Sequence, residues 1–142
     1  MHRKLRFFWI VAAIVLMAGC GRGDGRRGLS GVVRLDGVAV DQGSISFAPV
    51  EGPVLTTAGA MIQGGRYTVP NGHGLMPGRY RVRVFWPQPQ SDANPLEGRI
   101  GPPPLERIPE RYNAKSELTV EVQANTSNQF DFDLTTSGSE SR

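Results

Sequence analysis

The strongest constraint on the fold is a period-two alternation of apolar and polar side chains that recurs along residues 29–134. It is clearest from Arg79 to Phe85, where one tyrosine and two valines alternate with three arginines. Successive side chains of a strand point to opposite faces of a sheet. This segment therefore predicts an antiparallel strand with one buried and one solvated face.

The same alternation predicts six further short strands, at 29–35, 44–48, 58–62, 66–69, 117–122 and 128–134. Turn signals separate them, including Asp36-Gly37 and Gly64-Gly65. No segment after residue 20 has the apolar spacing of a helix. About seven turn-separated strands are typical of a two-sheet fold. We expect an all-β chain with a single antiparallel β-sandwich over residues 29–134, in which apolar side chains fill one core.

Two segments lack the alternation. Residues 86–109 hold most of the 11 prolines and predict a loop excursion that contains no strand. The polar residues 135–142 predict a disordered tail.

The amino terminus has the layout of an export signal. Three basic residues and no acid occur in residues 1–6, and an apolar run from Phe7 to Ala18 follows. The run is shorter than the roughly 20 residues that a membrane-spanning helix needs, so we expect residues 1–19 to be a signal peptide that is cleaved.

Cys20 is the single cysteine of the chain, and the small residues Ala18 and Gly19 precede it. This arrangement resembles the lipobox of bacterial lipoproteins, which implies cleavage between Gly19 and Cys20 and acylation of the Cys20 thiol. The alternatives are a buried thiol or an ordinary secretory signal with an incidental cysteine. Several acyl chains give a stable anchor, so the membrane is the expected partner of the N-terminal cysteine.

Residues 20–28, rich in Gly, Arg and Asp, predict a flexible tether between the anchor and the domain. Gly21 stands where an aspartate would retain an enterobacterial lipoprotein at the inner membrane. The resemblance therefore implies an outer-membrane protein of the cell envelope, which faces the periplasm or the outside.

Charge and composition exclude several functions. Removal of residues 1–19 takes away three basic residues and leaves basic and acidic residues in equal number. Nucleic-acid binding relies on excess positive charge, so we expect no such partner. With one cysteine and two histidines, we expect no Cys-based zinc site, no catalytic triad, no metal and no cofactor.

Several motifs along the domain resemble those of carboxypeptidase regulatory-like domains. Residues 31–49 read GVVRLDGVAVDQGSISFAP, against the family pattern G-x-V-x-x-D-G-x-P-[VL]-x-x-G-x-I-x-F-x-P; Ala39 replaces the proline. Residues 64–67 (GGRY) and 77–84 (PGRYRVRV) are similar to its G-x-Y and P-G-x-Y-x-V-x-V segments. Residues 108–134 look like the end of small lipoproteins that are abundant in planctomycete bacteria.

The resemblance implies a transthyretin-like or immunoglobulin-like sandwich that has no catalytic residues of its own. In metallocarboxypeptidases this module accompanies the catalytic domain, whose zinc ligands are two histidines and a glutamate. Only His73 remains after the signal is removed, so we expect this chain not to be an enzyme. Hydroxyisourate hydrolases of transthyretin-like fold need further histidines and a C-terminal motif that residues 137–142 do not resemble.

Trp86 and Tyr112, at the proline-rich segment, are the candidate binding surface for a glycan or a protein partner. The alternative is that both rings fix the segment onto the sandwich. His73 is either a ligand-binding or pH-sensing imidazole or an exposed turn residue. Asp131 and Asp133 share one face and predict either calcium ligands or a solvated strand face, and we favour the latter. The arginines of residues 79–83 similarly predict an anion ladder or, preferably, a solvated face.

Two functions follow from these observations. The first is a non-catalytic, lipid-anchored envelope lipoprotein whose sandwich is a structural or protein-interaction module. The alternative is a carbohydrate-binding module that recognises envelope or extracellular polysaccharide through Trp86 and Tyr112.

Overall fold

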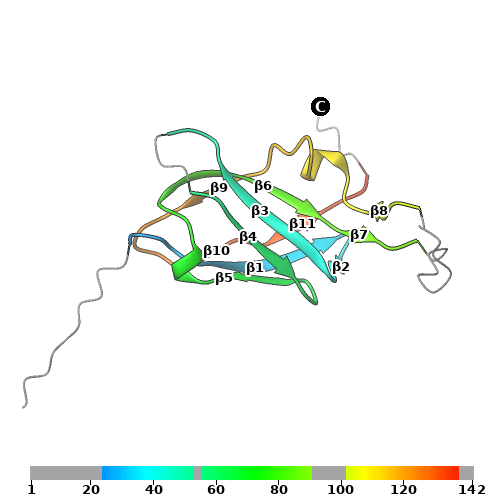
Figure 1. Cartoon of the computed structure of the whole chain (residues 1–142), viewed down its shortest axis with the longest axis horizontal. Coiled ribbons are helices and arrows are strands. Elements are labelled where there is room, and N and C mark those ends of the chain that lie inside the picture. Colours follow the sequence, from blue (N-terminus) through cyan, green and yellow to red (C-terminus); the bar gives the residue numbers. More distant parts are fainter. Residues whose placement is uncertain (1–23, 53–55, 91–101, 138–142) are drawn as a thin grey trace, which may run out of the picture.

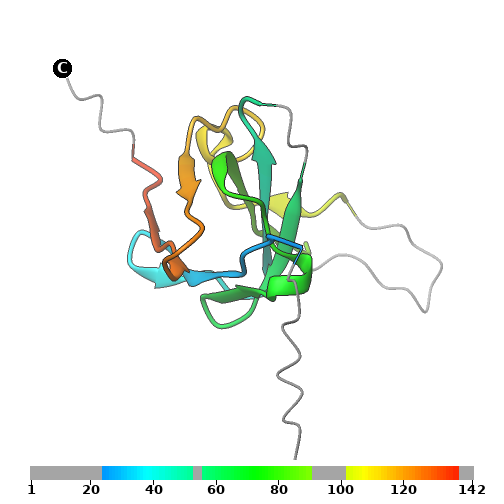
Figure 2. The same cartoon turned by 90° about the vertical axis from the view of Figure 1, so that its left-hand side faces the viewer.

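The computed structural model describes residues 24–52, 56–90 and 102–137. Two β-sheets lie face to face around one apolar core (Figures 1 and 2). The five strands of the first sheet are β1 (Leu29–Leu35), β2 (Val38–Ala39), β5 (Arg66–Val69), β10 (Asn128–Gln129) and β11 (Phe132–Leu134). The second sheet has the order β4-β3-β6-β9, formed by β4 (Ala58–Ile62), β3 (Gly43–Pro49), β6 (Gly78–Phe85) and β9 (Thr119–Val122). The predicted all-β sandwich is confirmed.

The core side chains are those that the alternation places inward. Tyr80, Val82 and Val84 of β6 are each at most 2% exposed. On β3, Phe47 lies opposite Val82 and Ile45 opposite Val84, and both are equally buried. Burial of such side chains contributes about 1.5–3 kcal/mol each, so this pair of central strands is a major source of the stability of the fold.

Four short elements of the described residues lie outside the two main sheets. The 3-10 turns η1 (Asn71–His73) and η3 (Glu110–Tyr112) precede β6 and β9. The strands β7 (Pro87–Gln88) and β8 (Leu105–Glu106) pair antiparallel with each other. The prediction that residues 86–109 contain no strand is therefore wrong at both ends of this segment. Two-residue strands are too short to produce a periodic pattern.

Both predicted glycine turns are present, and in each case the chain passes to the other sheet either at the turn or shortly after it. Asp36 and Gly37 have positive φ angles of 50° and 80°, as a two-residue hairpin turn requires. The strand β2 that follows has only two residues, after which the chain crosses to the second sheet as β3. Gly64 and Gly65 likewise lead from β4 in one sheet to β5 in the other.

One sheet is mixed, which corrects the prediction of a wholly antiparallel sandwich. Strand β1 runs parallel to β10 and β11, the last two strands of the described chain. Parallel neighbours need a long crossover connection. Here the rest of the domain forms that connection, and an alternation within single strands carries no information about it.

The predicted strand 128–134 is interrupted. Asp131 inserts its side chain into the ladder, where Oδ1 accepts a hydrogen bond of 2.8 Å from the backbone N–H of Val32. The opposing residue, Gly31, approaches so closely that a Cβ atom there would lie 1.8 Å from the carbonyl oxygen of Phe130. The hydroxyl of Tyr67 donates to the same carbonyl at 2.9 Å. Two short strands, β10 and β11, therefore replace one longer strand.

The ordered domain extends beyond the predicted limits at both ends. Arg27, predicted to belong to a flexible tether, exchanges two backbone hydrogen bonds with Leu75, and Gly28 donates to Oδ1 of Asn71. At the other end, Thr136 donates from its N–H and its hydroxyl to the carboxylate of Asp36. Residues 135–137 of the predicted disordered tail thus lie against the domain.

Candidate functional site

The ends of the proline-rich segment are held together by Glu106 on β8. Its Oε1 accepts hydrogen bonds of 2.8 Å from the backbone N–H groups of Trp86 and Ile108. The backbone N–H of Arg107 also donates to the carbonyl of Trp86 at 3.2 Å. One carboxylate therefore joins the end of β6 to the chain that returns from β8, and a carboxylate acceptor makes such bonds stronger than neutral ones.

Trp86 is partly buried and packs against the core cluster. The Arg107 guanidinium lies 5.9 Å from the centre of its ring, a cation–π distance. Its indole Nε1 is buried and, among the described residues, has no hydrogen-bond partner. The indole ring thus packs against the core and also contacts the Arg107 guanidinium. Such packing is expected for a residue that fixes the segment onto the sandwich.

Tyr112, in η3, also packs against the core cluster. The Arg111 guanidinium lies 4.7 Å from its ring centre. The same guanidinium donates to the carbonyl oxygens of Thr135 and Ser137 and thereby holds the end of the described chain. The hydrogen bond between the Tyr112 hydroxyl and Thr135, together with Arg111, lowers the pKa of Tyr112 from its ordinary value.

Two separate hollows lie beside these residues. One, of about 600 Å³, opens between the end of β6 and η3, and its apolar lining includes Phe85, Leu105 and Ile108. The other, of about 490 Å³, is lined by Tyr112 and its neighbours in η3 and before β9. Trp86 lines neither of them. The two aromatic residues of the predicted binding surface therefore do not share one hollow.

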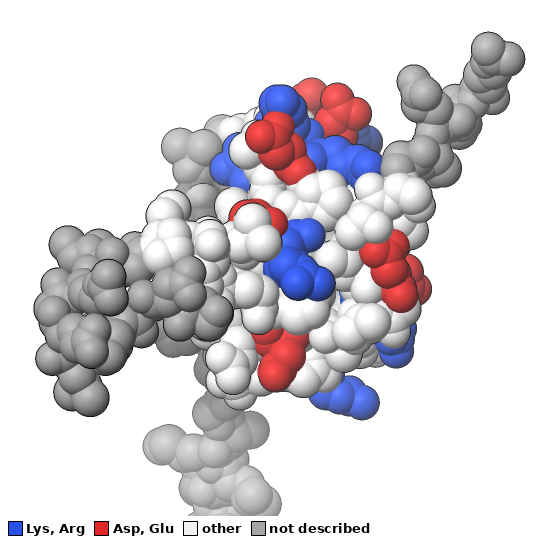
Figure 3. Space-filling view, turned by 90° about the vertical axis from the view of Figure 1, so that its right-hand side faces the viewer, with Lys and Arg blue, Asp and Glu red and all other residues white. Residues whose placement is uncertain are grey.

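Figure 3 looks onto the end of the sandwich from which the β7–β8 hairpin projects. Basic and acidic side chains are interspersed there among uncharged ones. The ion pair between Lys115 and Glu110, at 2.6 Å, belongs to η3 and the residues after it. The hydrogen bond and the charge attraction between the two side chains lower the pKa of Glu110 and raise the pKa of Lys115. Because both side chains are exposed, the pair contributes little to stability.

The remaining predicted candidates are His73 and the two aspartates at the last strands, and they lie on different elements. His73 is exposed in η1. Asp131 holds the Val32 N–H, and Asp133 pairs with Arg34 at 3.4 Å. Within the described ranges, no three His, Cys, Asp or Glu side chains form a group that could hold a metal ion. The two aspartates are thus both engaged by residues of one neighbouring strand, β1.

The arginines of β6 lie on the outer face of the second sheet. In the register, Arg79 faces Glu121 and Arg81 faces Thr119, both on β9. Arg83 faces Ser46 on β3. Arg79 and Arg81 are exposed, whereas Arg83 is half-buried and its Nε has no hydrogen-bond partner among the described residues. The row is therefore a sheet face that is solvated at Arg79 and Arg81 and partly covered at Arg83.

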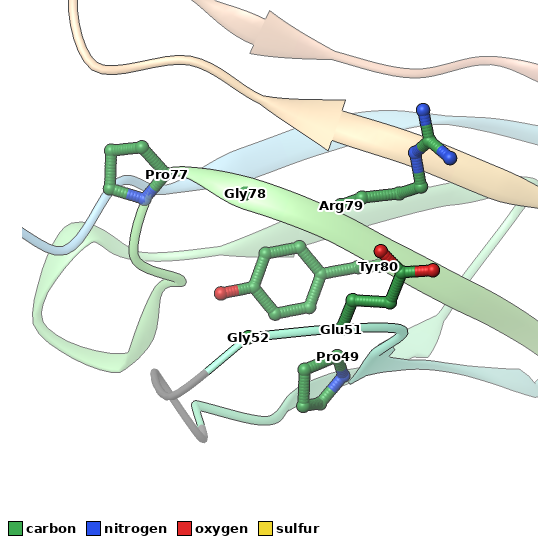
Figure 4. A pocket seen from close by; sticks show the side chains of 7 residues that line it. All are labelled: Pro49, Glu51, Gly52, Pro77, Gly78, Arg79 and Tyr80. Carbon is green, nitrogen blue, oxygen red and sulfur yellow. The ribbon is translucent and has the colours of Figure 1, made fainter.

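A small hollow of about 130 Å³ lies at the start of β6, at the opposite end of the sandwich from the hairpin (Figure 4). Arg79 and Tyr80 leave the strand on opposite sides, and Tyr80 points into the space between Pro77 and the loop that holds Glu51. The Tyr80 hydroxyl donates to the carbonyl of Met76 at 2.9 Å and lies 2.8 Å from the Thr56 hydroxyl. Its polar group is satisfied, so this hollow is a packed corner of the fold.

Glu106 and Arg111, which organise these ends, were not predicted from the sequence, and Asp36 was predicted only as part of a turn. The only available signals were a glutamate two residues before an apolar isoleucine and an arginine beside a tyrosine. Such pairs are common in solvated loops. Gly19 and Cys20 lie outside the described residues, and the described part contains no helix with the length and hydropathy that a membrane crossing requires.

Comparison with known proteins gives no match to the chain from any family model, curated protein or solved structure. Fold and function therefore rest on the residues of this chain alone.

Proposed function

We propose that this chain is a non-catalytic lipoprotein of the bacterial cell envelope, acylated at Cys20 after removal of residues 1–19. Its sandwich is a structural or protein-interaction module that is held at a membrane, for which we propose the outer membrane. The observation that carries the proposal is the placement of the one cysteine, directly after a charged start, an apolar run and two small residues.

The fold supports this proposal through the position of the chain entry. Arg27 is the first residue with backbone pairing to the domain, so six residues separate Cys20 from it. An extended chain spans at most about 3.3–3.6 Å per residue. An anchor at Cys20 therefore keeps the entry end of the sandwich within about 25 Å of the lipid surface, and the β7–β8 hairpin projects from the other end (Figure 1).

We also propose that the sandwich is a carboxypeptidase regulatory-like module. The residues that resemble the motifs of this family lie at turns and in the core, where the fold itself requires such residues. Asp36-Gly37 and Gly64-Gly65 form positive-φ turns, and the tyrosine and valines of residues 80–84 are core residues. The motifs describe turns and core positions, so they favour a module without catalytic groups.

The decisive experiment is intact mass measurement and detergent partitioning of the protein expressed in a bacterial host. We expect the native chain to lose residues 1–19, to gain the mass of acyl chains and to partition into the detergent phase. Cys20→Ser should show neither acylation nor partitioning.

A matched control moves the thiol to another place. Cys20→Ser combined with Ser127→Cys restores one cysteine at an exposed loop position, and this variant should behave like Cys20→Ser. A native chain that remains soluble and unmodified would contradict the proposal and make Cys20 an ordinary thiol.

No observation on Trp86 or Tyr112 favours the glycan-binding alternative. Trp86 is the only tryptophan after residue 19, so its fluorescence reports on this question directly. We expect addition of envelope polysaccharide to leave the emission unchanged. A saturable change that is lost in Trp86→Phe would establish the alternative instead.

A further inference from the structure

The free edges of the two sheets differ in how they are protected. Natural edge strands usually carry charges, prolines or bulges that prevent pairing with another chain. Among the described edges, β9 carries Glu121, β5 carries Arg66 and β11 carries Asp133. The uncharged edge strands β2 and β10 have only two residues each, and such short edges are themselves a form of protection. Strand β4, with the sequence Ala-Gly-Ala-Met-Ile, has none of these devices and forms an uninterrupted register with β3. It is the least protected of these edges.

The side chains of β4 reinforce this contrast. Met61 is 61% exposed and points away from the core, opposite Ser44. Gly59, two residues earlier, lies on the same outer face opposite Ser46 and is also exposed. A shallow hollow of about 410 Å³, lined by these residues and Phe85, adjoins the edge. Figure 2 shows the strand that follows the grey segment 53–55 running along one side of the sandwich.

The sequence of β4 is complementary in size to itself when it is read antiparallel. With Ala60 opposite its own copy, each Met61 faces a Gly59, and each Ile62 faces an Ala58. A large side chain then meets a small one at every position except the central pair, where two alanines meet. A Cβ atom built on Gly59 would meet one atom within 4 Å, the Ile45 carbonyl oxygen at a tight 3.3 Å, and no side chain. No described side chain therefore covers Gly59, which leaves room for the methionine of a second copy.

The distribution of charged residues among the edge strands also favours β4 as the pairing edge. Two-fold pairing of a strand with itself brings identical side chains close together, because the interface is the same patch on both copies. At β5, β9 or β11 this would place like charges near each other, which is unfavourable. At β4 no charge is involved.

We propose that two copies of this chain associate through antiparallel pairing of β4 with β4, with Ala60 at the two-fold axis. The two four-stranded sheets then join into one sheet of eight strands, and the two hollows beside Met61 meet across the axis. Backbone hydrogen bonds supply the affinity, and the fit between glycine and methionine sets the register. Acylation is not required for this association.

The experiment measures the mass of the unacylated mature chain, residues 20–142 with Cys20→Ser, by sedimentation equilibrium. The buried core lies entirely within residues 29–134, so this protein keeps the folded domain. We expect a reversible dimer. Met61→Lys places a cation on the exposed outer face of the edge, and it should weaken the dimer by about tenfold or more without changing the thermal midpoint of dilute monomer.

Gln129→Lys is the matched control, because it adds the same charge to an exposed residue at the opposite edge of the sandwich. It should leave the dimer unchanged. A chain that stays monomeric up to millimolar concentration would overturn the proposal. So would a dimer that Gln129→Lys weakens and Met61→Lys does not.

A cysteine experiment tests the register. In the Cys20→Ser protein, Gly59→Cys together with Met61→Cys places two thiols opposite each other in both halves of the interface, within disulfide reach. Mild oxidation should convert this double variant into a covalent dimer. Met61→Cys alone should crosslink far more slowly, because its two copies lie diagonally. Equal crosslinking of both proteins would overturn the proposed register.

Discussion

Gly31 shows how one missing side chain permits the joining of the first and last strands. Its backbone lies against the Phe130 carbonyl at a distance that leaves no room for a Cβ atom. The nearby Asp131 carboxylate replaces a backbone acceptor for Val32. A tight backbone approach of this kind is a common reason for a glycine inside a strand.

We predict that Gly31→Ala lowers the free energy of unfolding by about 2–3 kcal/mol, because the strand must move to accommodate the methyl group. Urea denaturation of the unacylated mature chain measures this loss. Gly72→Ala is the control, since a Cβ atom at Gly72 meets nothing within 4 Å, and it should change stability by less than about 0.5 kcal/mol. Similar values for the two variants would show that the approach at Gly31 tolerates a side chain.

The Asp36 carboxylate connects the first turn to Thr136, near the end of the described residues. This contact makes the stability of the fold depend on pH, and the sign of the dependence can be stated. The hydrogen bonds from Thr136 lower the pKa of this carboxyl below its ordinary 3.8. A group with a lowered pKa stabilises the fold above its unfolded pKa, and this contribution is lost as the pH falls through the folded value.

We therefore expect Asp36→Asn to be less stable than the native chain at neutral pH and to approach it below the lowered pKa. Asparagine tolerates the positive φ of this position, so the turn itself is retained. Thermal unfolding of both proteins from neutral pH to strongly acidic pH measures the difference. A difference that is constant over this range would exclude the carboxylate as its source.

At the scale of single elements, the β7–β8 hairpin depends on one side chain more than on its own length. A pair of two-residue strands contributes little, since isolated hairpins are marginal in water. The Glu106 carboxylate holds both sides of the base through the Trp86 and Ile108 amides.

We predict that Glu106→Ala costs about 1–2 kcal/mol of stability and, above all, speeds hydrogen exchange at these two amides. Amide exchange followed by NMR measures this effect residue by residue. Glu117→Ala removes an exposed glutamate near β9 and should leave both amides protected. Unchanged exchange in Glu106→Ala would mean that packing alone closes the hairpin.

The elements themselves were largely predictable from the sequence, because alternation is a local property. The inward residues of β3 and β6 follow directly from it, and both glycine turns follow from the equally local Asp-Gly and Gly-Gly pairs. Which strands share a sheet depends on contacts between distant residues, so neither the parallel pairing of β1 nor the change of sheet at Gly65 has a local signal. The split at Asp131 also escapes prediction, because a side chain there substitutes for a backbone group.

For the candidate site, the sequence predicts which segment of the chain is involved but not how its side chains are arranged. Trp86 and Tyr112 both flank the hairpin region, as the proline-rich composition suggests. Their packing against the core and the arginines beside their rings depend on the folded arrangement. An aromatic residue in a loop has the same sequence signature whether its ring is exposed or covered.

At the scale of the whole molecule, the chain entry and Trp86 lie at opposite ends of the sandwich. Trp86 follows the end of β6, and an eight-residue strand spans about 27 Å. If the protein is anchored at Cys20, Trp86 is held well away from the lipid.

We predict that brominated lipids quench Trp86 fluorescence weakly in vesicles that carry the acylated protein. A variant with Trp86→Phe and His73→Trp places the one tryptophan of the mature chain in η1, beside the chain entry, and it should be quenched more strongly. The reverse order would show that the hairpin end lies on the membrane.

If the chain is exported as we propose, the parallel pairing of β1 with β10 and β11 also determines when the domain can form. The first strand would then emerge early from a translocation pore, but its neighbours on one side would be the last strands to arrive. Contacts between such distant segments slow folding. Under the proposed export, the first sheet would therefore stay incomplete until residue 134 had crossed, and the chain would remain unfolded enough to pass through a pore for almost the whole of its passage.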